Sequence, residues 1–277
     1  MSSISRFKWM NTILTHISDR SPEQVVTDLF DHQLRWIWLV ISFLYFANLM
    51  KFNLSREESG YRTALSASDY VLPDGIALQK FYDREMTTWK KLHNCNGTDL
   101  IPAYLDKVYE SWAIPWVWLL TVYDESIWKY KDDEEDIQHK RSERFWTMLS
   151  YFEHVHYKER NQEWSYDLEA LIKSAVDTHS PHKILILCTW TPHQEIRAHT
   201  HSKQLKDAGL LVFCAWGLID YIVWVEKRAP NWVVKARVLE TFWRVVTKPK
   251  KNLKKFLVMF KIMWYWRKKY VRGVETI

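Results

Sequence analysis

The sequence predicts an open α/β fold, with a Rossmann-like, mainly parallel sheet, flanking helices and a basic helical appendage at the C-terminus. Two observations predict the sheet. Continuous apolar runs at 183–188 (KILILC) and 210–215 are typical of strands that are buried on both faces. These runs alternate with helical segments, which is the order that parallel βαβ units require.

Composition divides the chain into three segments: a polar N-terminal segment (1–33), an α/β core (34–226) and a basic appendage (227–277). A chain of 277 residues can bury a core without disulfides. The three cysteines form no CxxC pair and the N-terminus carries no apolar secretory region, so we expect a cytoplasmic protein.

The elements follow in order along the chain. Ser21 and Pro22 predict a helix start, as the cap and the first helical residue. The apolar run 36–50 is shorter than the roughly 20 residues of a membrane span, so it favours a buried strand. Further strands are expected at 70–72 and 116–122, and further helices at 55–70, 76–92, from about Leu100, at 131–144 and at 166–178.

Ligands of an open parallel sheet bind at the carboxyl ends of its strands, which here are followed by loops 73–75, 94–99, 189–195 and 216–220. Asp74 lies in the first of these loops, between Pro73 and Gly75. A carboxylate there can act as a general base. It can equally be a turn residue that bonds its own backbone.

The next two loops each open a helix. Thr98 or Asp99 is expected to cap the helix after loop 94–99, and the N-terminus of a helix can also receive a phosphate. Gln194, at the start of the helix after the 183–188 strand, can bond a sugar or a base edge. The alternative is that Thr191–Glu195 is only a helix-start signal.

Metal and nucleotide fingerprints are absent from the sequence. The eleven histidines form only short-range pairs and no HExxH, so we expect no metal site. Neither GxGxxG nor GxxxxGK[ST] occurs.

The C-terminal part is strongly basic. Ten Lys or Arg and no acidic residue lie within 248–272, which leaves the rest of the chain at −4 within a net charge of +6. Lysines mixed with bulky apolar residues at 253–266 predict a helix in the interface of an anionic membrane. The alternative is a packed helix with a basic outer face, and nucleic acid is disfavoured because no RNA-binding motif accompanies it.

Taken in order, the loops resemble the WecG/TagA/CpsF glycosyltransferase family over about residues 35–260, with a poor match at 123–165. The matching pieces are YFANLM (45–50), LSASDYVLPDGIAL (65–78), NGTDLIP (96–102), TPHQE (191–195), GLIDY (217–221), KRAPNW (227–232) and ETFWRVVTKPKK (240–251).

The resemblance implies an inverting transfer of an N-acetylmannosamine-type sugar from a UDP donor to a polyprenyl-diphosphate-linked acceptor, in cell-surface polysaccharide or teichoic acid synthesis. It implies no metal cofactor and a place at the inner face of the cell membrane. Asp74 would be the catalytic base, and Arg228 and Arg244 would bind the diphosphate. The implied substrate-binding residues are Asn48, Gly75, Gly97, Thr98, Asp99, Thr191, Gln194, Glu195 and Asp220.

The chain departs from the family pattern at two functional positions. Phe46 stands where the family has Thr, and His93 and Asn94 stand where an Arg is expected. Two other hypotheses therefore stay open: a non-catalytic, membrane-associated binding homologue, and an integral protein anchored by 36–50.

Tryptophan is abundant and glycine scarce: the chain has 17 Trp and 6 Gly, where average usage would give about 19 Gly. Trp190, Trp216 and Trp224, and a residue near Trp118, stand where the resemblance implies glycine. A tryptophan side chain strongly disfavours the backbone conformations that glycine adopts. Our hypothesis is a gene in which UGA specifies glycine, translated with UGA read as Trp; the alternative is a degenerate homologue with genuine tryptophans.

Overall fold

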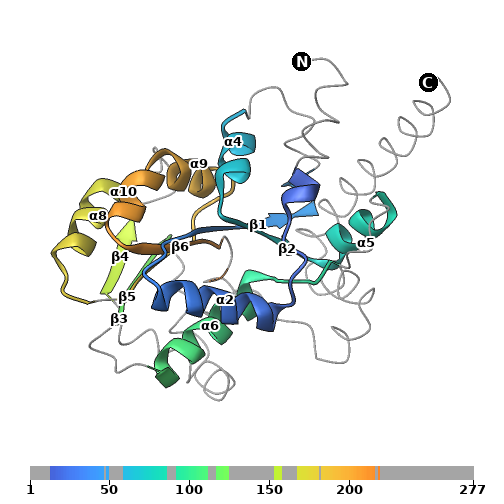
Figure 1. Cartoon of the computed structure of the whole chain (residues 1–277). Helices are drawn as coiled ribbons and strands as arrows, with labels where there is room; N and C mark the ends of the chain where they lie inside the picture. Colours follow the sequence, from blue (N-terminus) through green and yellow to red (C-terminus); the bar gives the residue numbers. More distant parts are fainter. Residues whose placement is uncertain are drawn as a thin grey trace, which may run out of the picture. The chain divides into compact units, whose positions relative to one another are not determined.

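A computed structural model gives the fold (Figure 1). It describes residues 13–46, 48–49, 59–85, 92–111, 117–124, 153–157, 167–180, 182–215 and 218, and the structural statements below refer to these. The chain divides into two compact units, Met1–Glu226 and Lys227–Ile277. All described residues belong to the first unit.

Six parallel strands form one sheet in the order β2-β1-β6-β5-β3-β4. The prediction of an open, parallel α/β fold is confirmed. Strand β4, at one edge of the sheet, was not among the predicted strands. The strands are β1 (Val40–Tyr45), β2 (Tyr70–Asp74), β3 (Val117–Asp124), β4 (Glu153–Tyr157), β5 (His182–Leu187) and β6 (Leu210–Cys214).

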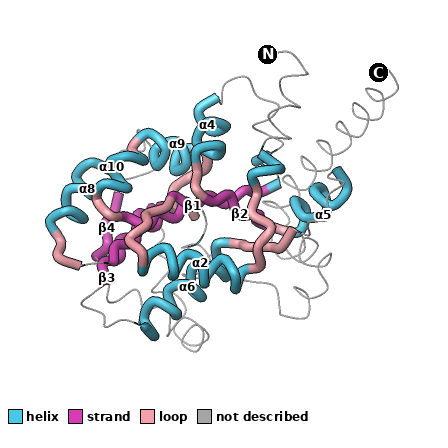
Figure 2. The backbone as a smooth tube through the Cα atoms, viewed as in Figure 1, coloured by secondary structure: helices cyan, strands magenta, loops and turns pink. Residues whose placement is uncertain are grey.

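Helices cover both faces of the sheet (Figure 2). Helices α2 (Pro22–Leu34) and α6 (Gly97–Ser111) pack together on one face. The opposite face carries α8 (Leu168–Asp177), α9 (His193–Thr200) and α10 (Ser202–Asp207). Helix α4 (Ser59–Ala67) packs on α9, and α5 (Ile76–Glu85) follows β2.

Strand β6 shows why the apolar runs are continuous. Leu211 and Phe213 belong to the core under α2 and α6, whereas Leu210, Val212 and Cys214 belong to the core on the other face. Every residue of the strand is buried. A parallel strand that is covered on both faces needs no polar alternation, so the run is apolar throughout.

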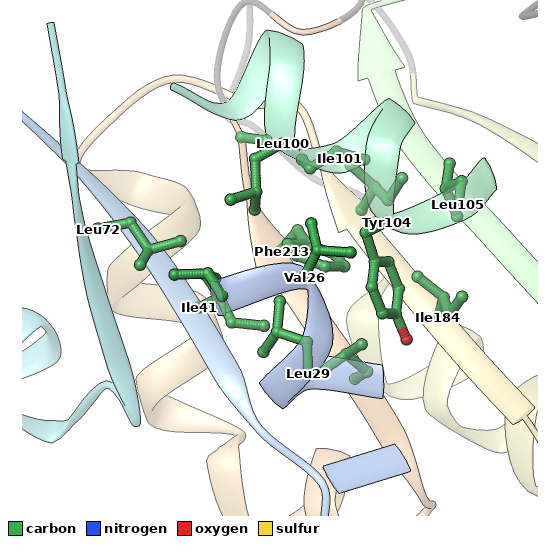
Figure 3. Packing of buried hydrophobic residues seen from close by; sticks show 14 of the residues in the cluster. Val26, Leu29, Ile41, Leu72, Leu100, Ile101, Tyr104, Leu105, Ile184 and Phe213 are labelled. Atoms are coloured by element: carbon green, nitrogen blue, oxygen red, sulfur yellow. The ribbon is translucent and has the colours of Figure 1, made fainter. Parts of the chain in front are cut away.

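The core under α2 and α6 is built from both helices and several strands (Figure 3). The ring of Tyr104 on α6 lies 5.5 Å from the ring of Phe213, centroid to centroid. The Tyr104 hydroxyl donates a hydrogen bond to Oε1 of Gln33 on α2. The buried polar end of Tyr104 is thus paired, and the bond joins the two helices.

The apolar run 36–50 contains β1, of which every residue but Tyr45 is buried. The prediction of a buried strand is confirmed for Val40–Tyr45. No described helix combines the length and the hydropathy that crossing a membrane requires. The helix predicted at 131–144 lies outside the described residues.

Helix α2 starts at a capping box, as Ser21 and Pro22 predicted. The Ser21 hydroxyl oxygen accepts from the backbone N–H of Gln24, and the Ser21 N–H donates to Oε1 of Gln24 at 2.9 Å. These two bonds satisfy donors at the helix end that would otherwise lack a partner.

Substitution of Ser21 by alanine is expected to lower the free energy of unfolding by about 1 kcal/mol, because one capping bond is lost. Urea unfolding would measure the change. Ser66→Ala, at an exposed position inside α4, is the matched control and should leave stability nearly unchanged. An equal effect of both substitutions would contradict a capping role.

Candidate active site

Asp74 ends strand β2 at the carboxyl edge of the sheet. The register pairs Asp74 with Tyr45, the last residue of β1, so both strands end at the same level. Gly75 follows with a φ of +90°, a conformation that side chains disfavour. Its N–H donates to Oδ1 of Asn94 at 2.7 Å. A fixed turn thus holds the partly buried Asp74 at this edge.

A backbone hydrogen bond holds the loop that leads into α6 beside this turn. The Cys95 N–H donates to the carbonyl oxygen of Pro73 at 2.8 Å. Gly97, the first residue of α6, lies against the ring of Phe43 on β1. A Cβ at Gly97 would sit 3.3 Å from that ring, which is closer than ordinary packing allows. The amino end of α6 therefore lies next to Asp74.

Asn96 caps α6, so the prediction that Thr98 or Asp99 does so is wrong. Oδ1 of Asn96 accepts from the Asp99 N–H at 2.9 Å and from the Thr98 hydroxyl at 2.7 Å. Oδ2 of Asp99 accepts from the Asn96 amide at 2.9 Å. The helix starts at Gly97, before the expected Leu100, which makes Asn96 the residue in the capping position. Asn ranks among the best caps, so the sequence held this signal.

A polar cluster, defined by Thr191, Gln194 and Glu195, follows β5. Oε1 of Glu195 accepts from the Thr191 hydroxyl at 3.0 Å and from Nε2 of Gln194 at 2.9 Å. Gln194 is 1% exposed and Glu195 2%, whereas Thr191 is partly exposed. A ligand at this edge therefore meets Thr191 first, while Gln194 and Glu195 support it from the interior.

Burial raises the pKa of the Glu195 carboxyl to about 7, and the hydrogen bonds from Gln194 and Thr191 oppose that rise. No described residue bonds Oε2 of Glu195 or Oε1 of Gln194. A neutral carboxyl is favoured where one oxygen is buried without a donor. The sequence predicted these three residues as part of the site. It could not show that their side chains bond one another or that Gln194 and Glu195 are buried, because both depend on folding.

The two groups of predicted site residues lie apart along the edge of the sheet. Strands β2 and β5 are separated by β1 and β6. Three strand spacings correspond to about 14 Å between Asp74 and the loop after β5. One small group cannot contact both places, so this edge suits an extended ligand.

The structure describes some of the other residues predicted from the sequence, and the rest lie outside the described ranges. Asn48 lies just beyond β1 and is partly exposed. Phe46 is buried and its ring lies 5.3 Å from that of Phe81 on α5. Trp190, in the loop after β5, is 41% exposed. Asp220, Arg228, Arg244 and the basic stretch 248–272 lie outside the described residues.

Within the described ranges, no group of three or more His, Cys, Asp or Glu side chains could hold a metal ion. The expectation of a metal-free reaction stays a prediction.

A model of the glycosyl transferase WecG/TagA/CpsF family matches residues 11–274, which is nearly the whole chain. The chain belongs to this family. The match includes 123–165, where the resemblance in sequence was poor, and the positions of Asp220, Arg228 and Arg244. No curated protein matches the chain.

The chain is thus a glycosyl transferase of cell-surface polysaccharide synthesis, acting with a sugar-nucleotide donor and a glycan acceptor. Its carboxyl edge of parallel strands is where such a fold binds its ligand.

Proposed function

We propose that this glycosyl transferase moves an N-acetylmannosamine-type sugar, with inversion, from a UDP donor to a polyprenyl-diphosphate-linked acceptor. The observation that carries the proposal is Asp74: a carboxylate fixed at the carboxyl edge of the sheet in a family that transfers glycosyl groups. Such a carboxylate suits the role of a general base.

In this mechanism Asp74 takes the proton of the acceptor hydroxyl as its oxygen attacks the anomeric carbon. The new glycosidic bond forms while the bond to UDP breaks, and UDP leaves with the bonding electron pair. One base and a single displacement invert the anomeric centre.

The departing UDP gains negative charge that has to be balanced. In the proposal, Arg228 and Arg244 bind the diphosphate, because a guanidinium matches phosphate oxygens without a metal. The amino end of α6 offers the backbone N–H groups of Gly97 and Thr98 at the same edge, whereas the N–H of Asp99, the third proposed residue there, is bonded to Asn96. Asn48, Gly75, Thr191, Gln194, Glu195 and Asp220 complete the proposed substrate site.

UDP release tests the proposal. UDP-N-acetylmannosamine and a polyprenyl-diphosphate-linked sugar would be incubated with two proteins. One has tryptophan at 190, 216 and 224, and the other carries Trp190→Gly, Trp216→Gly and Trp224→Gly. We expect UDP release that needs both substrates, survives EDTA and gives the inverted anomer. No release with any glycan acceptor would support the non-catalytic binding homologue, and activity restored only by added Mg²⁺ would contradict the metal-free mechanism.

A lipid-linked acceptor requires the enzyme at a membrane, and the ten basic residues of 248–272 support a peripheral place on the anionic inner face. Neutralising Lys254 and Lys255 with glutamine should weaken binding to phosphatidylserine vesicles roughly 30-fold, at about 1 kcal/mol per charge. Vesicle sedimentation would measure this.

The matched control is the pair Lys80→Gln and Lys173→Gln, at exposed positions on α5 and α8, which should leave vesicle binding unchanged. Equal binding to neutral phosphatidylcholine vesicles, or equal losses in both pairs, would contradict the membrane role of this stretch.

A further inference from the structure

Helix α2 ends in a Schellman turn, a helix-ending motif with a fixed pattern of hydrogen bonds. The Ile37 N–H donates to the carbonyl oxygen of His32 at 2.9 Å, and the Trp36 N–H donates to that of Gln33 at 3.1 Å. Arg35 is the last residue with near-helical geometry. Residue 36 is therefore the position of the motif that takes a left-handed backbone and is usually glycine.

Trp36 adopts that left-handed backbone, with a φ of +59°. In the described part of the chain three residues have a positive φ, and the other two are Gly75 and Gly209. A Cβ in this conformation approaches the following carbonyl oxygen too closely, so a bulky residue there is an outlier.

The Trp36 side chain does not explain why the backbone accepts this strain. It is 59% exposed, stacks on the ring of His182 at 6.1 Å and meets Trp38 edge-on at 6.0 Å. Its neighbours Leu34 and Ile37 are 49% and 41% exposed. Leu34, Trp36 and Ile37, here called the apolar patch, are thus three exposed apolar residues close together in the chain. The ring of Trp36 adds exposed surface to them and fills no interior space.

We infer that residue 36 is glycine in the protein that its own cells make, because codon 36 is a UGA that those cells translate as glycine. The left-handed backbone at the end of α2 supports glycine at residue 36 independently of any sequence resemblance. The excess of tryptophan and the deficit of glycine in the whole chain agree with this assignment. Glycine here removes the strain and reduces the patch to Leu34 and Ile37.

The codon and the native peptide test the inference directly. We expect UGA at codon 36, and a peptide mass for glycine at this position when the protein from its own cells is analysed by mass spectrometry. A UGG codon, or a native peptide that contains tryptophan, would overturn the inference. In that case the patch of Leu34, Trp36 and Ile37 would be a genuine feature of the surface.

Thermal unfolding tests separately whether the left-handed backbone at residue 36 favours glycine. Trp36→Gly and Trp36→Ala remove the same ring, and only alanine keeps a Cβ at the positive φ. Trp36→Gly should therefore melt about 2–4 °C above Trp36→Ala. Trp38→Gly is the matched control: Trp38 has no positive φ and packs on Gly209, so its loss should lower the Tm. A Trp36→Gly protein that melts no higher than Trp36→Ala would overturn the assignment of glycine from backbone geometry.

Discussion

Replacing Asp74 with asparagine is expected to lower kcat roughly 10²- to 10⁴-fold, the usual contribution of a general base. Asparagine has nearly the same shape and cannot take the proton of the acceptor hydroxyl. The turn made by Gly75 and Asn94 should persist, because its bond joins the Gly75 N–H to the Asn94 side chain. Steady-state UDP release, with the donor and then the acceptor varied, would measure kcat and both KM values.

Asp83→Asn is the matched control for this substitution. Asp83 is exposed on α5, which directly follows the turn after Asp74, so the same change in charge occurs nearby without touching the proposed base. We expect Asp83→Asn to retain activity. A kcat within a few-fold of the parent for Asp74→Asn, at an unchanged melting temperature, would contradict the role of Asp74 as base.

Replacing Glu195 with glutamine is expected to remove a large pH dependence of stability. The carboxyl has a pKa of about 7 when folded, against an ordinary value of 4.5. Since the folded pKa is the higher one, its contribution to stability is complete below pH 4.5 and is lost as the pH rises through 7. The difference corresponds to about 3 kcal/mol at 1.36 kcal/mol per pH unit. Glutamine keeps an oxygen that can accept from Thr191 and Gln194 and does not titrate.

Urea unfolding of the parent and of Glu195→Gln between pH 4.5 and 7.5 would measure this effect. The parent should lose stability relative to the variant as the pH rises. Asp177→Asn, at an exposed site on α8, should run parallel to the parent over this range. Parallel curves for Glu195→Gln as well would show that the buried carboxyl does not titrate in this range.

Most of the sheet could be predicted from the sequence, because strands buried on both faces leave uninterrupted apolar runs such as KILILC at β5. Strand β4, with the sequence EHVHY, leaves no such run. It lies at an edge of the sheet and pairs only with β3, where fewer apolar residues are needed. Local composition could not reveal it.

The sequence predicted where the candidate site lies, but not which of its side chains are buried. Asp74 ends one parallel strand and Thr191 follows another, and ligands bind at the carboxyl ends of such strands, so the sequence predicted both residues at one edge of the sheet. The sequence could not show that Gln194 and Glu195 are buried, since burial depends on packing between α9 and β6. The strain at Trp36 was equally invisible, because the helix end that demands a left-handed residue is defined by hydrogen bonds.

The position of β6 affects how the chain folds while it is being synthesised. This strand is the last one described in the chain, yet it lies third in the sheet and pairs with both β1 and β5. Until residue 214 has left the ribosome, β2-β1 and β5-β3-β4 are two separate half-sheets with open edges, which are prone to aggregate. In a host that stops at UGA, a stop at codon 36 would end the chain before β1. Such a host would therefore accumulate no partly active fragment.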